Sequence, residues 1–290
     1  MSQKFSQPIK IFLSGVLLFL VSTNQTSAQS LQLPPINEPY IAVEIMKPDL
    51  DGAANIGATS SIWYLDAHFP VGKGGIFMFT ELPFSYYSDA ALSAGFYEFS
   101  DINYKFLVGN PLIGVEIRKS GSTTGGYGTF AVRLTIADEK RVFPIIYAFV
   151  TDFDRFDAFL PNQYSIQLGG GGRFDLGAQD YELRFDIGAT VMGIIPEDSR
   201  FDTELFLKYY GQFWLMFPKV NLNLGLSGIA IITERDLDLS ERIEQQLTFG
   251  IQLKPGKVRP GAFIRIPLTD ELSQSIEFVA GINLTFVVGD

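Results

Sequence analysis

Apolar and polar residues alternate with a period of two along most of this chain. Residues 276 to 288 show the pattern clearly, because Phe278, Ile282 and Phe286 share one parity while Glu277 has the other. Successive side chains of a β-strand point to opposite faces, so this period predicts a strand with one apolar face. A helix would repeat its apolar residues every three or four positions instead. The same alternation recurs in residues 128 to 137 and 180 to 194.

The length of these runs indicates the kind of sheet to which the strands belong. They extend over about 9 to 15 residues, the length that a tilted strand needs to cross a bilayer, whereas strands of soluble sandwiches average about 5 or 6. The second parity carries Gly, Asn, Thr, Gln and charges of both signs, a mixture typical of a wet barrel interior. The pattern therefore predicts an all-β fold, a transmembrane antiparallel up-and-down β-barrel.

About 14 windows fit such a strand, and the connections between them alternate in length, as expected for periplasmic turns and external loops. Windows 40–47 and 142–150 are the least regular, partly because Pro144 has no N–H for a sheet ladder, so 12 strands is the second choice. The short connections are 71–74, 109–110, 138–141, 175–179, 218 and 255–257. The longer ones are 48–60, 84–100, 119–127, 151–162, 195–201, 233–242 and 269–275.

The first 28 residues have the features of a secretory signal. Lys4 and Lys10 precede an apolar run from residue 11 to 21, and small residues end at Ala28. The run is shorter than the roughly 20 residues that a membrane-spanning helix needs. We therefore expect a signal peptide at residues 1–28 that is cleaved near Ala28, a short N-terminal tail at 29–39, and the barrel at 40–290.

Composition and charge restrict the partners and the compartment. The chain contains no Cys, which excludes disulfides and thiolate metal sites, and no other metal or cofactor motif is complete, so we expect neither. Cleavage removes Lys4 and Lys10 from the 22 basic residues and leaves 20 against 32 acidic ones, which argues against a nucleic-acid partner. A barrel behind a secretory signal indicates the outer membrane of a Gram-negative bacterium, with membrane lipid and the barrel-assembly machinery as partners.

Charged residues of both signs share the parity that faces the predicted lumen. Neighbouring strands supply opposite signs at similar heights, which predicts a ladder of ion pairs that fills a narrow interior. A strongly ion-selective pore would need a ring of one sign, and the sequence does not show one. The predicted ladder comprises Asp66, His68, Lys105, Glu116, Arg118, Arg133, Arg173, Glu182, Arg184, Asp186, Glu204, Lys208, Arg265 and Glu277, with Glu44 and Glu81 on the same parity.

His68 is the single histidine and the candidate for catalysis. It shares the lumen parity with Asp66, and an outer-membrane hydrolase would combine a His with a nucleophile or an acid. No nucleophile motif accompanies it, so a polar lumen histidine is the favoured interpretation, and we do not expect an enzyme.

Aromatic residues cluster in two predicted external loops. Exposed rings cost free energy unless they bind something or pack on each other. Packing over the barrel mouth is the favoured interpretation, and a groove for an apolar ligand is the alternative. Asp152, Asp154 and Asp157 are expected to be solvated loop charges, since no Gly completes a calcium loop around them. The candidate apolar entrance comprises Phe84, Tyr86, Tyr87, Phe153, Phe156, Phe159 and Leu160.

The order of these pieces resembles a known family. Gly109-Asn110-Pro111 lies between two predicted strands, Gly169 to Gly172 lie within a strand after a long loop, and alternating apolar residues form a closing strand. In these respects residues 60 to 290 resemble the Gram-negative outer-membrane hydrophobic-compound transporters of the FadL and TodX type, and the porin-like group associated with phenol degradation. The Asn-Pro-Ala motif of the FadL hatch does not occur in residues 29 to 60.

The resemblance and the barrel pattern together predict an outer-membrane channel for passive uptake of small hydrophobic compounds. The first alternative is a structural or adhesive barrel that conducts nothing, because its lumen is filled by the charge ladder. The second alternative is an outer-membrane hydrolase that uses His68.

Overall fold

The computed structural model describes residues 38–50, 60–72, 75–87, 106–118, 124–177, 181–198, 202–234, 238–274 and 276–288. Most of the predicted signal peptide and tail therefore lies outside the described residues. The strands are β1 Tyr40–Leu50, β2 Ser61–Pro70, β3 Ile76–Tyr86, β4 Phe106–Val108, β5 Leu112–Arg118, β6 Gly125–Arg133, β7 Gln163–Gly177, β8 Glu182–Pro196, β9 Glu204–Met216, β10 Val220–Ile231, β11 Ile243–Leu253, β12 Val258–Pro267 and β13 Ile276–Val287. The helical elements are α2 Val142–Thr151, the 3₁₀-helix η2 Phe153–Ala158, α3 Leu239–Arg242 and α4 Asp270–Ser273.

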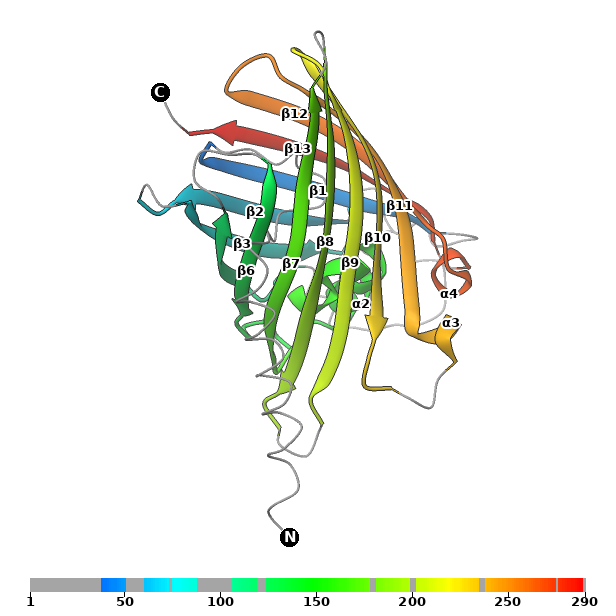
Figure 1. Cartoon of the computed structure of the whole chain (residues 1–290). Coiled ribbons are helices and arrows are strands. Elements are labelled where there is room, and N and C mark those ends of the chain that lie inside the picture. The colour runs from blue at the N-terminus through cyan, green and yellow to red at the C-terminus, as the bar shows by residue number, and fades with distance from the viewer. Residues whose placement is uncertain are drawn as a thin grey trace.

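The strands form one closed antiparallel barrel (Figure 1). Along the sheet the order is β2-β1-β13-β12-β11-β10-β9-β8-β7-β6-β5-β3-β4, and a further pairing of β2 with β3 closes the ring. Because β4 and β5 both pair with β3, the thirteen strands fill twelve positions in the wall. The predicted transmembrane-type barrel is confirmed, with the second choice of strand number.

The prediction of a hairpin turn at Gly109-Asn110 is wrong. Strand β4 pairs with the end of β3 and β5 pairs with its beginning, so both continue in one direction along the same neighbour. Residues 109–111 face only Leu82 and Pro83 on β3, which makes the break a β-bulge. Pro83 and Pro111 have no N–H to donate, so the ladder is interrupted where the extra residue enters.

The prediction of a strand at 142–150 is also wrong, since these residues form helix α2. Pro144 would remove a ladder bond from a strand but is tolerated in the first turn of a helix. Apolar residues on both parities also suit a helix, whose buried positions Pro144, Tyr147, Ala148 and Thr151 recur every three or four residues. The 40–47 window, by contrast, is a strand, as predicted.

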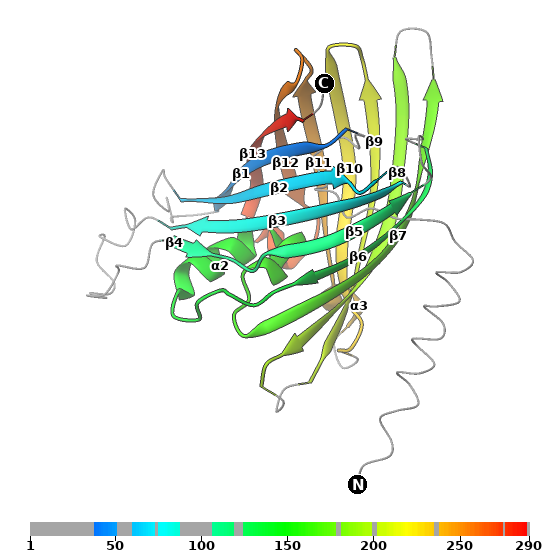
Figure 2. The ribbon, with the colours of Figure 1, turned by 90° about the vertical axis from the view of Figure 1, so that its left-hand side faces the viewer.

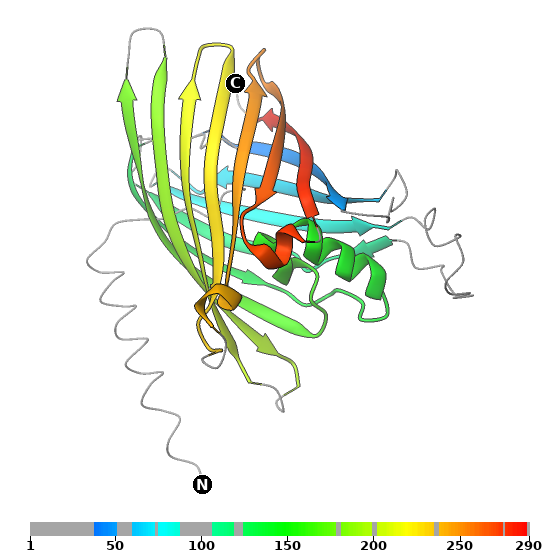
Figure 3. The ribbon, with the colours of Figure 1, turned by 90° about the vertical axis from the view of Figure 1, so that its right-hand side faces the viewer.

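These two corrections reassign two connections. One end of the barrel, here called the turn end, carries the described links 217–219 and 254–257, and β2, β5 and β7 end there while β3, β6 and β8 begin there. The opposite, long-loop end carries α3, α4 and residues 134–162 with α2 (Figures 2 and 3). Residues 138–141, predicted as a short turn, therefore lie at the long-loop end.

The wall is apolar outside and polar inside, the reverse of a water-soluble protein. On β10, Leu222, Leu224 and Leu226 are 39–42% exposed, whereas Asn221 and Asn223 are at most 6% exposed. The strands alternate in this way around the ring, which suits hydrocarbon outside and polar groups inside. Among the described residues, no helix has the length and hydropathy to cross a membrane.

The reassigned connection makes a labelling prediction. Single cysteines introduced by Lys140→Cys and Thr233→Cys, both exposed at the long-loop end, should react with an impermeant maleimide on intact cells. Gly256→Cys at the turn end should react only after lysis. If Lys140→Cys instead labels together with Gly256→Cys, residues 142–150 cross the wall and the helical assignment is wrong.

Candidate functional site

The connection between β6 and β7 enters the barrel, and we call residues 134–162 the inward segment. Helix α2 lies at the long-loop end against β1, β3 and β4. It ends at Asp152, whose N–H donates to the carbonyl oxygen of Ala148. The chain then turns into η2, in which Phe153, Asp154, Phe156 and Asp157 are all buried. A short, charged helical segment therefore occupies the lumen.

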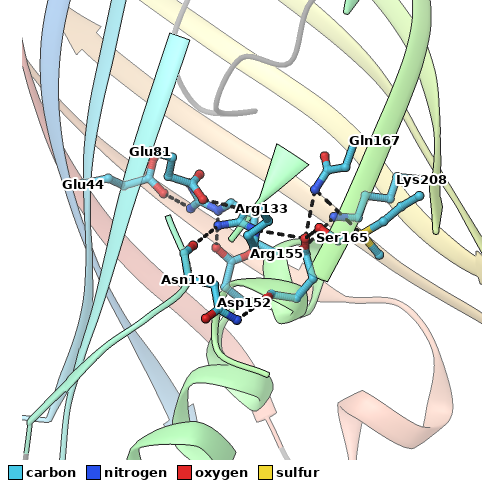
Figure 4. A network of polar contacts seen from close by, with 11 residues as sticks. Glu44, Glu81, Asn110, Arg133, Asp152, Arg155, Ser165, Gln167 and Lys208 are labelled. Atoms are coloured by element: carbon cyan, nitrogen blue, oxygen red, sulfur yellow. Dashed lines mark hydrogen bonds and ion pairs between the residues drawn. The ribbon is translucent and has the colours of Figure 1, made fainter. Parts of the chain in front are cut away.

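Asp157 accepts hydrogen bonds from four side chains of the wall. Arg133 Nε lies 2.9 Å from Oδ2, Ser165 Oγ 2.6 Å and Gln167 Nε2 2.9 Å, while Lys208 Nζ lies 3.2 Å from Oδ1. These donors come from β6, β7 and β9 (Figure 4 shows the wall side chains). A buried carboxylate is costly unless it is paired, and two cations and two neutral donors satisfy this one.

Arg155 reaches the opposite part of the wall. Its Nε lies 2.6 Å from Asp152 Oδ2 and one terminal nitrogen 3.2 Å from Glu81 Oε2, while the other donates to Glu44. The guanidinium also lies over the Tyr64 ring, 3.5 Å from its centroid. Figure 4 shows the guanidinium among carboxylates of β1 and β3. Arg fits this position because its planar fork serves several acceptors at once.

Three further contacts complete the set. Arg265 of β12 donates to Asp152 at 2.7 Å, and Asp154 accepts from Ser227 of β10 at 2.8 Å and from Gln246 of β11. The side chains of residues 152–157 thus bond to eight strands of the wall: β1, β3, β6, β7, β9, β10, β11 and β12. Contacts in so many directions mean that η2 spans the lumen.

Asn110, in the bulge of the wall, holds both ends of the inward segment. Its Oδ1 accepts from the N–H groups of Ile136 and Ala137, at 2.8 and 2.9 Å. Its Nδ2 donates to the carbonyl oxygens of Asp157 and Leu160, at 3.3 and 2.6 Å. A Cβ on the neighbouring Gly109 would lie 2.4 Å from the Ala158 carbonyl oxygen, so the close approach requires glycine. The bulge is a docking point.

The acids of the inward segment titrate differently. Burial raises the pKa of Asp152, but the Arg155 and Arg265 guanidiniums outweigh it and lower the value from 3.8 to about 2. Burial also raises the pKa of Asp157, but Arg133 and Lys208 outweigh it, and the pKa lies below its ordinary value. Asp154 has neutral donors, so burial dominates and its pKa is raised. Asp152 and Asp157 therefore bind the wall as anions.

A second polar network lies in the turn-end half of the barrel. Arg173 pairs with Asp186 at 2.9 Å, and Tyr127 donates to the same carboxylate. Elsewhere in this half, His68 Nε2 lies 3.4 Å from Glu116 Oε2. The imidazole is stacked between the rings of Tyr40 and Phe77, with centroids 5.3 and 4.8 Å away, and is 1% exposed. His68 is thus a packed lumen residue.

Most residues of the predicted ladder lie inside the barrel, but not all. Lys208 is half-buried against Asp157, and Glu182 is half-buried beside Arg184 at the turn end. Glu204 and Glu277 are exposed at the long-loop end, and Lys105 lies outside the described residues. The buried members are Asp66, His68, Glu116, Arg118, Arg133, Arg173, Arg184, Asp186 and Arg265.

The residues of the predicted apolar entrance are spread over three places. Phe153 and Phe156 pack with Met192, Ile194, Phe206 and Ile229 of the wall, and Leu160 packs against this cluster. Phe159 and Tyr87 belong to a second buried cluster beside α2. Phe84 and Tyr86 face outward with Trp63 and Phe106.

The acids at the centre of the site are not among the site residues predicted from the sequence. Asp152, Asp154 and Asp157 were expected to be solvated, but they are 1%, 8% and 4% exposed, so that expectation is wrong. Asn110 was assigned to a turn. A usable signal was present, because acids and Phe residues interleave within six positions, and such a segment suits a polar lumen with apolar patches better than it suits water. Among the described residues, no three His, Asp or Glu are grouped closely enough to hold a metal ion.

A cavity of about 860 Å³ opens at the long-loop end beside the inward segment, and we call it the mouth cavity. Phe156 and Leu160 of the inward segment and Ile194 and Phe206 of the wall provide apolar lining. Its polar lining includes Asp198, Asp202, Glu204 and Glu234.

Comparisons with known proteins support the fold class. No protein-family model matches the sequence, and no curated protein matches it significantly. Among solved structures, the chain is similar to an outer-membrane channel of Pseudomonas putida F1, with a TM-score of 0.57, 13% identity, and coverage of 91% of this chain and 100% of that one. It is also similar to LpxR from Salmonella typhimurium, with a TM-score of 0.54, 8% identity, and coverage of 86% and 100%. The chain thus has the fold of outer-membrane β-barrels.

The Asn110 clamp predicts that its removal loosens the inward segment. Asn110→Ala deletes four side-chain hydrogen bonds, so a buried reporter thiol at Ala148→Cys, where Ala148 is 0% exposed, should react with maleimide at least about tenfold faster than in the wild-type background. Asn221→Ala, which changes a buried lumen amide on β10, is the matched control and should leave the rate unchanged. Equal rates in all three backgrounds would show that Asn110 does not hold the segment.

The pKa shifts predict a two-phase response to acid. The lowered pKa values of Asp152 and Asp157 favour docking above about pH 4, and this contribution is lost as the pH falls toward 2. The raised pKa of Asp154 acts oppositely, because docking is favoured once that carboxyl is protonated. Ion conductance across a planar bilayer should therefore fall on acidification as Asp154 becomes protonated, and rise below about pH 3.

The variant Asp154→Asn separates the two phases. It should abolish the first change and keep the opening at low pH, with heat-resistant gel migration showing that the barrel is intact. A conductance that stays constant between pH 4 and 2.5 would contradict the ionic docking of the inward segment.

Proposed function

We propose that this protein is a porin-like channel of the Gram-negative outer membrane that passively admits small hydrophobic compounds, and that the inward segment is its gate. The observation that carries the proposal is the position of residues 152–157, whose side chains bond to eight strands and so cross the lumen. The apolar outer wall supports membrane lipid as its surroundings and the barrel-assembly machinery as the means of insertion.

The chemistry of the contacts favours a gate over a permanent core. The inward segment is joined to the wall covalently only at its two ends. In the lumen its polar side chains are held by ion pairs and hydrogen bonds, while Phe153 and Phe156 pack on the wall. Water can replace such bonds, so the net cost of releasing a hydrated segment is far smaller than the gross strength of its contacts. A lumen filled by wall side chains alone would offer no such release.

The hydrophobic class of solute is supported by the mouth cavity and by the resemblance to the FadL and TodX type. Phe156, Leu160, Ile194 and Phe206 offer apolar surface at the entrance, and burial of apolar area can draw a solute out of water. We rank a hydrolase lower, because the His68 ring is stacked between two aromatic rings and 1% exposed.

Solute uptake by intact cells tests the channel directly. Cells that produce the protein should take up the hydrophobic dye 1-N-phenylnaphthylamine faster than cells without it. Leu160→Asn, which places an amide in the mouth cavity, should reduce that uptake several-fold. Leu268→Asn changes an exposed Leu at the same end of the barrel, outside the residues that line the cavity, and should have no effect.

Swelling of proteoliposomes in a small polar sugar provides the second arm. Leu160→Asn should leave this swelling unchanged, because the polar solute gains nothing from apolar contact. If the wild-type protein increases neither dye uptake nor swelling, the channel proposal fails and the non-conducting structural barrel replaces it.

A further inference from the structure

We propose that the mouth cavity selects apolar compounds that carry a positive charge, such as hydrophobic ammonium or phosphonium ions. This inference rests on the proposed function only in taking the cavity as the entrance, and binding at the cavity can be measured without transport. It concerns the sign of the ligand's charge, which the hydrophobic class leaves open.

The floor of the cavity is preformed apolar surface. Phe156 and Phe206 meet edge to face with ring centroids 5.1 Å apart, and together with Ile194 they are at most 8% exposed. Aromatic rings held by their neighbours lose little conformational freedom when a ligand arrives. A volume of about 860 Å³ lies within the range of cavities that enclose drug-sized molecules. The floor therefore suits a compact apolar body.

The rim supplies charge of one sign. Four carboxylates line the cavity, from Asp198 and Asp202 in the β8–β9 connection and from Glu204 and Glu234 at the strand ends. Asp202, Glu204 and Glu234 are exposed. None of the described residues that line the cavity is Lys or Arg. The polar part of the entrance is therefore acidic.

A described cation behind the floor, Lys208, is already paired. Lys208 Nζ lies 6.0 Å from the centroid of the Phe156 ring, on the lumen side, and it is paired with Asp157 at 3.2 Å. An organic cation can in addition lie against the negative face of an aromatic ring. Apolar contact and charge thus favour the same ligand, whereas an anion of equal shape meets the acidic rim.

Two ions of nearly equal shape and opposite charge test the proposal. Tetraphenylphosphonium and tetraphenylborate are titrated into the purified protein in a non-ionic detergent, with detergent alone subtracted. The wild-type protein should bind the phosphonium at least about tenfold more tightly than the borate. The triple variant Asp202→Asn, Glu204→Gln and Glu234→Gln should weaken phosphonium binding about tenfold, since three exposed carboxylates each contribute modestly.

A matched triple variant, Glu38→Gln, Asp138→Asn and Glu277→Gln, removes the same number of exposed acids away from the cavity and should bind as the wild type does. Equal binding of both ions, no phosphonium binding at all, or equal loss in the two triple variants would each overturn the proposal. Dye and sugar uptake test the channel separately. A protein that conducts but does not discriminate the two ions would contradict only the charge selectivity proposed here. A discriminating protein that conducts nothing fails only as a channel.

Discussion

Every strand of this wall must find a hydrogen-bonding neighbour on both sides, and the rest of the structure follows from that constraint. In hydrocarbon an unpaired backbone edge costs several kcal/mol for each group, so the sheet has to close, and the pairing of β2 with β3 closes it. Closure at twelve positions sets the width of the lumen, because the diameter of a barrel follows its strand number. The space inside then has to be filled by side chains, water or an additional segment, and the inward segment fills its long-loop half.

The inward segment is charged because the wall residues around it are charged, and the two sets of charges pair with each other. Glu44, Glu81, Arg133 and Arg265 of the wall are all buried, and a buried charge is costly unless it is paired. The wall itself pairs Glu81 with Arg133 at 2.8 Å and Glu44 with Arg265 at 3.7 Å. Asp152, Arg155 and Asp157 provide the opposite sign at each place. Buried ion pairs contribute little net stability compared with apolar packing, so they suit a part that docks and releases better than one that only stabilises. The bulge at Asn110 interrupts the wall, and it places the Asn110 side chain where it holds the inward segment.

The strand framework could be predicted from the sequence because a barrel wall imposes a period of two on nearly every residue, and β10 obeys it from Val220 to Ser227 and β13 from Val279 to Phe286. The predictions are wrong where the type of residue is set by contacts other than those of the barrel wall. Residues 142–150 are apolar on both parities because a helix packs them, and Gly109-Asn110-Pro111 resembles a turn because a bulge needs the same residue types. Asp152 to Asp157 resemble solvated loop acids, since the cations that bury them are distant in sequence, 24 positions away for Arg133 and 113 for Arg265. Such partners cannot be identified before the strands are placed in the ring.

A reversible crosslink between η2 and the wall tests most directly whether the inward segment is a gate. Asp154 Oδ2 and Ser227 Oγ lie 2.8 Å apart, so Asp154→Cys with Ser227→Cys brings two thiols close together in a chain that has no other cysteine. Solute flux through proteoliposomes should be blocked when this pair is oxidised and restored by a reductant, while each single variant conducts under both conditions. Flux that is the same with the disulfide closed and open would show that solutes pass without displacing the segment, and would contradict the account.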